Sequence, residues 1–253
     1  MKKTIYLTVL SVITIACILI GSYRFSSNFS FRFFGWNWND RPSRSVHTES
    51  LTLSSFHTIK ADLDVAEITI EEGADYSLYY EATKELIPQY ELKEDVLTLR
   101  HQNQSLRDQL KHGNNECSII ITVPAGTSFT LLDLCSDVGD ITLENVQCQK
   151  AIITSDVGEI KIEYGTITAL DLSTSIGDID VENTTFQTLD ASSDVGEVKI
   201  RPNDPVSKYS LDLKTDVGEI SILNNDYMQH YNSTGTDGYS ITASSSVGDV
   251  TIK

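Results

Sequence analysis

The second half of the chain repeats one short phrase, Asp-Val-Gly-Glu-Ile or a close variant, at an almost fixed step. The gaps between its glycines are 19, 19, 19, 22 and 30 residues, and the glycines are Gly139, Gly158, Gly177, Gly196, Gly218 and Gly248. A fixed period of this size is typical of a solenoid, in which each unit buries its apolar face against its neighbours. The repeat therefore constrains the architecture more tightly than it constrains the function.

Positions counted from each glycine carry the same kind of residue in every copy. Aliphatic residues stand two and four positions after the glycine and five and seven before it, as in Ile141, Leu143, Leu134 and Leu132 of the first copy. Each copy thus predicts two short strands joined at a Val-Gly corner, with equivalent side chains stacked about 4.8 Å apart. The Val or Ile just before each glycine is expected to form one more such ladder, and the glycine to supply a positive φ.

These spacings predict an all-β protein, a narrow parallel β-helix or flattened β-solenoid with about 19-residue coils. Leucine-rich repeats would need an Asn ladder and helical segments, and calcium-binding nonapeptide repeats would need Gly-Gly-x-Gly-x-Asp; neither signature occurs in the sequence. A β-sandwich of irregular hairpins would not keep a 19-residue step three times running.

Further strands are expected upstream of the regular copies. Residues 58–70 look like a worn first copy, with Ala66 in place of the glycine. Strand-like segments follow at 76–81, 90–92, 96–100 and 118–123. Residues 102–115 break the pattern and are expected to form a surface loop.

The N-terminal residues predict a membrane anchor. Residues 4–20 are uncharged, and as a helix they would rise roughly 26 Å, near the lower limit for a bilayer span. Lys2 and Lys3 precede them, which favours an uncleaved signal anchor with its N-terminus inside the cell. A cleaved signal peptide, a lipoprotein acylated at Cys17 and a buried core helix are the alternatives. The expected layout is a cytoplasmic tip at 1–3, a transmembrane signal anchor at 4–21, a juxtamembrane linker at 22–50 and an extracytoplasmic solenoid at 51–253.

Two segments are candidate partner-binding surfaces. The linker is rich in aromatic residues, including Trp36 and Trp38, and is interpreted as a membrane-proximal spacer, with a stripe that binds another membrane protein as the alternative. The 30-residue gap holds an insertion at 224–239, which is either a recognition loop or a tolerated one. Its candidate contact residues are Tyr227, Met228, His230, Tyr231 and Tyr239. The chain stops on a strand at Lys253, so that end of the solenoid is expected to lack a cap unless something else covers it.

Charge is unevenly distributed along the chain. Residues 1–44 hold six basic side chains and one acid, so residues 45–253 hold 13 basic and 35 acidic side chains, a formal charge of −22. A body this acidic repels phosphate polymers, which argues against nucleic acid as a partner. Cationic peptides, divalent metals and basic protein patches are the favoured partners.

Many of the acidic side chains lie in two rows that flank the Val-Gly corner, one two positions before the glycine and one directly after it. The simpler interpretation is a solvated turn edge that keeps the coils soluble, since Asp favours turns and salt screens neighbouring charges. The alternative is a calcium-binding edge, because hard cations take clustered carboxylates. Ser175 and Ser246 interrupt one row and weaken that alternative, and no other cofactor is expected. The candidate calcium ligands are Asp137, Asp140, Asp156, Glu159, Asp194, Glu197, Asp216 and Glu219.

Signatures of catalysis are lacking in the sequence. The five histidines are scattered, and no nucleophile elbow, His-Glu-x-x-His or phosphate-cradling glycine loop occurs. Carboxylates recur too regularly for any pair to stand out as an acid and base, so the chain is expected not to be an enzyme. Cys117 and Cys148 are expected to be buried apolar thiols and Cys135 to be less buried. A disulfide between Cys117 and Cys135 is an alternative for those two residues.

Residues 51–253 as a whole resemble the bacterial putative-adhesin domain of unknown function, a β-solenoid of cell-envelope proteins. The resemblance rests on the worn copy at 61–68, on the Ile-Thr-Val-Pro-Ala-Gly lead-in at 121–126, and on the repeated Ser-Asp-Val-Gly-Asp/Glu-Ile. An N-terminal span before such a domain is similar to the LiaG-type membrane proteins of Gram-positive envelope-stress operons. The resemblance implies an envelope location and brings no catalytic residues with it.

The expected function is therefore that of a non-enzymatic, single-pass cell-membrane protein that binds or scaffolds envelope components during envelope stress. Cationic peptides or a membrane-bound sensor are its expected partners. A surface adhesin or structural protein is the first alternative, and a polysaccharide-active solenoid enzyme is the second.

Overall fold

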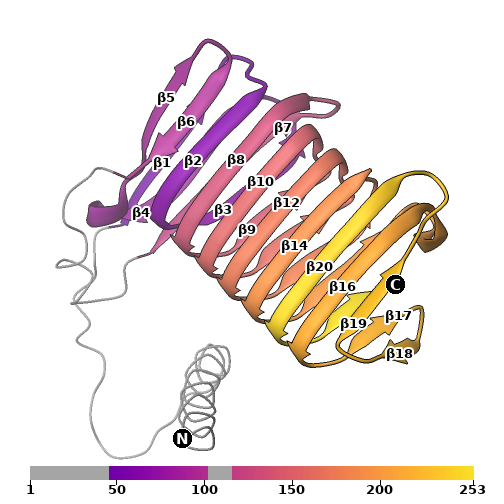
Figure 1. The fold of residues 1–253 in the computed structure, drawn as a ribbon. Coiled ribbons are helices and arrows are strands. Elements are labelled where there is room, and N and C mark those ends of the chain that lie inside the picture. Colours follow the sequence, from indigo (N-terminus) through magenta and orange to yellow (C-terminus); the bar gives the residue numbers. More distant parts are fainter. Residues whose placement is uncertain (1–45, 102–115) are drawn as a thin grey trace, which may run out of the picture. The chain divides into compact units, whose positions relative to one another are not determined.

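The computed structural model describes residues 46–101 and 116–253. The expected anchor, most of the linker with Trp36 and Trp38, and the loop at 102–115 lie outside the described residues. Within the described ranges, no helix is long and apolar enough to cross a membrane. The residues form an all-β solenoid of two sheets, as the repeat predicted (Figure 1).

Each coil consists of one strand in each sheet, joined at the Val-Gly corner. The regular copies pair with their equivalents in parallel, in the register expected from the glycine alignment. The worn copy forms a coil of the same kind, with Ala66 at its corner. In chain order the coils are β2 (Thr58–Val65) with β3 (Glu67–Gly73), β8 (Ser128–Val138) with β9 (Ile141–Glu144), β10 (Gln147–Val157) with β11 (Ile160–Glu163), β12 (Thr166–Ile176) with β13 (Ile179–Thr184), β14 (Thr188–Val195) with β15 (Val198–Pro202), β16 (Tyr209–Val217) with β17 (Ile220–Ile222), and β20 (Tyr239–Val247) with β21 (Val250–Ile252).

Antiparallel strands close the N-terminal end of the solenoid. The remaining strands there are β1 (Val46–Thr52), β4 (Ser77–Thr83), β5 (Gln89–Lys93), β6 (Val96–Arg100) and β7 (Cys117–Pro124). β7 pairs in parallel with β3. β4 pairs antiparallel with β7, and β1 pairs antiparallel with β4 at the edge of the sheet. In the other sheet β6 pairs in parallel with β2, and β5 pairs antiparallel with β6. β1 begins at Val46, so strand structure starts before residue 51, where the solenoid was expected to begin.

The four aliphatic ladders that the sequence predicted lie in the interior. Every residue two or four positions after a corner glycine, or five or seven before it, has at most 6% of its surface exposed. Examples from one coil are Ile160 and Ile162 on β11 and Ala151 and Ile153 on β10. Since each fully buried aliphatic side chain contributes about 1.5–3 kcal/mol, these ladders are the main source of stability.

The ladder just before the glycine forms in register as expected, and its side chains lie on the outside of the solenoid. Val138, Val157, Ile176 and Val217 are 45%, 41%, 38% and 62% exposed. The chain bends through the corner here, so the two residues before the glycine both face outward and the simple alternation ends. We call this stack the aliphatic ridge, which in spatial order comprises Val65, Val138, Val157, Ile176, Val195, Val247 and Val217.

The last coil in the sequence is not the last coil in space. β20 lies between β14 and β16 in one sheet (Figure 1). β21 lies between β15 and β17 in the other sheet. The expectation of an uncapped end at Lys253 is therefore wrong, because β21 is paired on both sides. The chain first builds β16 and β17, and then returns to fill the position that it skipped.

The insertion covers the true end of the solenoid. β18 (Asn225–Tyr227) pairs antiparallel with β17, and β19 (His230–Ser233) pairs antiparallel with β16. Edge strands otherwise present unpaired backbone groups. We call β18, β19 and their connection the cap. A segment expected as a protruding loop is thus largely a structural element of the two sheets.

Candidate functional site

The Val-Gly corners stack into a continuous edge along one side of the solenoid, which we call the corner edge. Its glycines are required by close approach. A Cβ at Gly158 would lie 2.1 Å from the carbonyl oxygen of Gly139. A Cβ at any of the other five corner glycines would lie 1.9–2.1 Å from a carbonyl oxygen of a neighbouring coil. Positive φ is shared by only four of the six, at 144° to 159°. The expected conformational role of glycine is therefore secondary to the lack of room for a side chain.

A row of buried hydroxyls holds successive corners together. Three residues before each glycine, a Ser or Thr donates a hydrogen bond of 2.8–3.2 Å to the carbonyl of the preceding corner in space. These side chains are at most 3% exposed. We call them the hydroxyl ladder, which in spatial order comprises Ser136, Ser155, Thr174, Ser193, Ser245 and Thr215. Sequence reasoning missed this ladder, although Ser or Thr at a fixed position in all six copies was a signal for it.

The acidic row just after the glycine is partly structural. In space its residues alternate strictly between Glu and Asp, and in that order they are Glu67, Asp140, Glu159, Asp178, Glu197, Asp249 and Glu219. Each of the three Asp side chains accepts the backbone N–H of the Glu on the next coil at 2.8 Å. The short Asp side chain can reach the neighbouring backbone, so these carboxylates satisfy amides at the turn.

The second acidic row lies two positions before the glycine, on the other side of the aliphatic ridge. Asp156, Asp194 and Asp216 are exposed there, with Ser175 and Ser246 at the interruptions. The structure thus brings the eight candidate calcium ligands to one edge. Within the described part of the chain, no three or more His, Cys, Asp or Glu residues are grouped so as to hold a metal ion. Calcium binding at this edge stays a prediction, and the melting temperature with calcium and with chelator tests it.

The outer face of the 11-stranded sheet has mixed charge, unlike the corner edge. Lys161 pairs with Glu163 at 3.0 Å, and Arg201 pairs with Glu182 at 3.5 Å. Lys199 reaches the corner edge and pairs with Glu197. No Lys or Arg stands one or two positions before a corner glycine, or one after it, in any copy. The corner edge is therefore the more uniformly acidic surface of the two.

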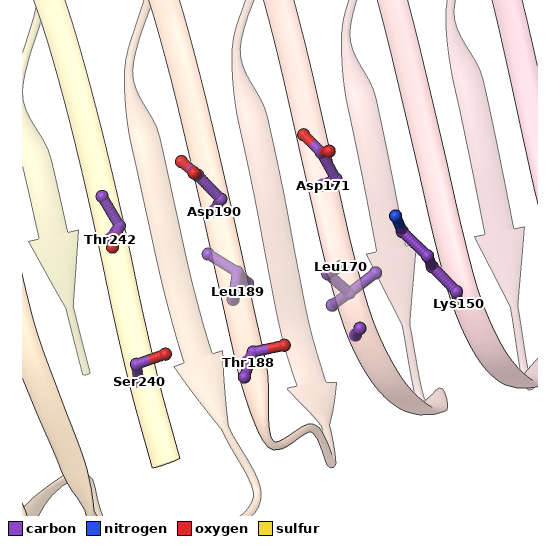
Figure 2. A pocket seen from close by; sticks show the side chains of 9 residues that line it. Lys150, Leu170, Asp171, Thr188, Leu189, Asp190, Ser240 and Thr242 are labelled. Atoms are coloured by element: carbon purple, nitrogen blue, oxygen red, sulfur yellow. The ribbon is translucent and has the colours of Figure 1, made fainter. Parts of the chain in front are cut away.

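A shallow hollow of about 330 Å³ lies on the outer face of the 10-stranded sheet (Figure 2). Asp171 and Asp190 lie side by side on β12 and β14, and Lys150 comes from β10. The pKa of Asp190 is raised above its ordinary value, first by partial burial and then by the negative charge of Asp171. Hydroxyls also line the hollow, from Thr188, Ser240 and Thr242, with the buried Leu170 and Leu189 among the lining residues. Such a surface offers hydrogen bonds to a polyhydroxylated ligand.

The cap gathers four of the candidate contact residues. The rings of Tyr227 and Tyr231 lie 4.4 Å apart, and Met228 is 85% exposed. His230 Nε2 lies 3.2 Å from Asp212 Oδ1 on the strand beneath. Tyr239 belongs instead to β20, where its ring packs 5.6 Å from that of Tyr209.

The three cysteines within the described residues have the burial expected of them. Cys117 and Cys148 are 5% and 4% exposed, and Cys135 is half-buried. All three are free and Cys117 and Cys135 lie in different sheets, so the alternative of a disulfide between them is wrong. Burial raises the pKa of Cys117 to about 12 and that of Cys148 to about 11, which keeps both thiols protonated at neutral pH.

Comparison with known proteins identifies the fold family. A family model described as Toastrack DUF4097 matches residues 126–253. This range begins just before β8 and ends at Lys253. The chain belongs to the Toastrack DUF4097 family. None of the curated proteins compared with it matches.

This chain is similar to solved bacterial structures. A putative cell adhesion protein from Clostridium sporogenes aligns with a TM-score of 0.52 and 16% identity, covering 83% of this chain and 99% of that one. A putative adhesin from Bacteroides fragilis aligns with a TM-score of 0.47 and 18% identity, covering 84% of this chain and 99% of that one. At 16% identity the likeness to the Clostridium sporogenes structure concerns the fold alone.

The Toastrack domain therefore offers three surfaces for partners, namely the corner edge, the hollow and the cap. The corner edge combines an exposed apolar stripe with carboxylates on both sides, and it extends along the coils. The hollow offers carboxylates, hydroxyls and one lysine on an open sheet face. The cap offers one exposed methionine and a tyrosine pair at the end of the solenoid.

Proposed function

We propose that this protein is a non-enzymatic, single-pass protein of the bacterial cell envelope. Its Toastrack solenoid would bind or scaffold envelope components outside the cytoplasmic membrane. The supporting sequence features are the uncharged residues 4–20 and the two lysines before them.

The observation that carries this proposal is the corner edge. Equivalent groups recur there about every 4.8 Å, with hydrogen bonds between coils that fix their positions. A surface of this kind suits an elongated partner that makes the same contact repeatedly, since each coil offers one more equivalent contact. The corner carboxylates of Asp140, Asp178 and Asp249 are engaged with backbone amides, which is a structural use rather than a catalytic one.

The acidic surface favours cationic partners. Residues 45–253 carry a formal charge of −22, which attracts basic peptides and speeds their encounter with the domain. Cationic peptides that attack the envelope, or a basic patch on a membrane-bound sensor, fit this charge. A role in the response to envelope stress follows from this choice of partner.

The location is tested by topology mapping of the full chain. We expect a C-terminally tagged chain expressed in bacteria to enter the membrane fraction, to resist extraction by alkaline carbonate, and to be digested by protease added to intact protoplasts. A matched chain that begins at Arg44, where the second of the two compact units begins, should stay in the cytosol. Recovery of the full chain in the soluble fraction, or its protection from external protease, would refute the proposed location.

The role in envelope stress is tested by deletion in the source bacterium. Loss of the protein should change sensitivity to cell-wall antibiotics or to cationic antimicrobial peptides, and the full chain should restore the original behaviour. Unchanged sensitivity to both classes would argue against an envelope-stress role while leaving the location intact.

A surface adhesin is the second candidate function. The Clostridium sporogenes structure of similar fold is described as a putative cell adhesion protein, and the polar hollow suits hydrogen bonding to a glycan. Adhesion to glycan-coated surfaces should then fall on deletion. Complementation with the full chain carrying Asp171→Asn and Asp190→Asn should fail to restore it, whereas unaltered adhesion by the deletion strain would rule out this candidate.

A further inference from the structure

The aliphatic ridge is an exposed apolar stripe that the fold does not bury. It consists of seven β-branched residues in direct register, one from each coil. Four of them are 38–62% exposed, and Val65, Val195 and Val247 are half-buried. Single exposed aliphatic residues are ordinary on protein surfaces, whereas a contiguous row of them marks an interaction site.

Carboxylates flank the ridge along its length. On one side the exposed members include Asp156, Asp194 and Asp216, and on the other side Asp140, Asp178 and Asp249 are exposed. The Oδ1 atoms of these last three accept backbone hydrogen bonds from the next coil. Because Lys199 pairs with Glu197, the charge is reduced at that one coil.

We propose that the aliphatic ridge is the docking surface for a cationic amphipathic helical peptide of about 20 residues. The proposal deepens, and rests on, the proposed function as an envelope-binding module. Seven positions at strand spacing span about 29 Å, and a 20-residue helix is about 30 Å long. The apolar side of such a helix recurs every turn, about 5.4 Å, close to the repeat of the ridge. Its basic residues would then lie over the two acidic rows.

Charge complementarity selects this occupant over two others. An anionic lipid surface would be repelled by both acidic rows. A second copy of the chain would bring its own carboxylates against them, and like charges placed face to face disfavour that contact. A helix with an apolar stripe between two basic flanks is attracted by the ridge and by both rows together.

The competing explanation is that Val and Ile occupy the ridge only because β-branched residues suit an extended backbone. Thr separates the two explanations, since it keeps the branching and the strand preference but replaces a methyl group with a hydroxyl. The variant Val138→Thr/Val157→Thr/Ile176→Thr should therefore fold normally and lose the apolar stripe. A matched control, Leu131→Thr/Ile152→Thr, makes the same kind of change on the outer face of β8 and β10.

Binding is measured with the full chain in nanodiscs of zwitterionic lipid, with empty nanodiscs as the blank. The probe is a fluorescent 20-residue amphipathic Leu/Lys helix, compared with a scrambled peptide of the same composition and with a Leu/Glu version. We expect the Leu/Lys helix alone to bind, and its affinity to fall about tenfold or more in the ridge variant. The control variant should bind as the original does, and both should keep the original melting temperature.

A charge variant, Asp156→Asn/Asp194→Asn, should also weaken binding and reduce its dependence on salt. Equal affinity of the original and ridge variants would overturn the proposal. If the charge variant then still lost affinity, the acidic surface would stand as the binding determinant and the ridge would not. If the original chain itself did not bind the Leu/Lys helix, the proposal would fail, while the topology and deletion experiments would still decide the proposed function.

Discussion

Replacement of Gly158 by alanine tests why the corners contain glycine. The added Cβ would lie 2.1 Å from the carbonyl oxygen of Gly139 and 2.6 Å from its carbonyl carbon, and Cβ contacts under 3.0 Å essentially never occur. Neighbouring coils would have to separate by about 1 Å at this point, since their spacing is otherwise about 4.8 Å. The backbone is a poor place to absorb such a shift, because the clash involves a carbonyl group rather than a flexible side chain.

The cost follows from the hydrogen bonds that this separation would break. Gly139 N–H donates to Val157 at 2.9 Å, and Ser155 Oγ donates to Gly139 at 3.1 Å. Stretching both by about 1 Å leaves buried groups without partners, at about 1–3 kcal/mol each. With residual overpacking of about 1 kcal/mol, we expect Gly158→Ala to lower the unfolding free energy by about 3–7 kcal/mol. For a domain of this size the melting temperature should fall by about 6 °C or more.

Two matched variants separate steric clash from backbone conformation. Gly165→Ala meets its nearest atoms at 3.3–3.4 Å and should cost less than about 1 kcal/mol. Gly126→Ala has open space around it but a φ of +80°, so it should cost about 1–2 kcal/mol. Circular dichroism during thermal and urea unfolding of the full chain measures all three. If Gly158→Ala cost no more than Gly126→Ala, the close-approach explanation of the corner glycines would be wrong.

Three further perturbations test other parts of the fold. Thr174→Val removes the hydroxyl that donates to Gly158 at 3.2 Å and should cost about 1–2 kcal/mol in urea unfolding; an unchanged midpoint would contradict a stabilising hydroxyl ladder. Removal of residues 239–253 should abolish cooperative unfolding and expose the chain to protease, because an interior coil is lost; a protease-resistant truncated chain would show that the final coil is dispensable. The pKa values of Cys117 and Cys148 are raised from 9.0 to about 12 and about 11. The two buried, protonated thiols contribute fully to the unfolding free energy below about pH 9. This contribution is lost as the pH rises from about 9 toward the raised pKa values, by up to about 1.4 kcal/mol per pH unit for each thiol. The Cys117→Ala/Cys148→Ala variant should therefore lose less stability between pH 9 and 11 than the original, and an equal loss would contradict the raised values.

The sequence was sufficient to predict the coils and their interior. A 19-residue step with alternating aliphatic residues leaves few other folds, because the four ladders must face the same side in every copy. The worn copy at 58–70 was recognised in the same way, since Ile68 and Ile70 keep the alternation after Ala66. Apolar periodicity is a strong signal wherever burial is what selects the residue type.

The alternation of inward and outward side chains does not predict the residues at the corner, because the bend of the backbone there decides which way each side chain faces. Extending the pattern of Leu170 and Leu172 would turn Thr174 and then Ile176 inward, and the first of these is indeed buried at 3% exposure. The chain then bends, so Ile176 faces outward although its type suggests the interior. A polar residue inside and an apolar residue outside reverse the usual rule, so neither the hydroxyl ladder nor the orientation of the aliphatic ridge was predicted. The candidate site was consequently identified by its carboxylates alone.

The spatial order of the coils was the second feature beyond the reach of the sequence pattern. Each coil is a near copy of the others, so apolar periodicity fits any order equally well. The acidic row just after the glycine indicates the spatial order of the coils. Its residues form pairs, in which an Asp on one coil accepts the backbone N–H of a Glu on the next. In chain order Glu197 is followed by Glu219, and no Asp would lie beside Glu219 to accept its N–H.

Placing the final coil between them supplies that Asp. Asp249 accepts the Glu219 N–H at 2.8 Å, and the alternation of Glu and Asp along the row becomes complete. The hydroxyl ladder is continuous in the same order, since Ser245 donates to Gly196 and Thr215 donates to Gly248. Two independent sets of polar contacts thus agree on one arrangement that the aliphatic ladders leave open. In this solenoid the apolar residues specify that coils stack, and the polar residues at the corner specify which coil stacks on which.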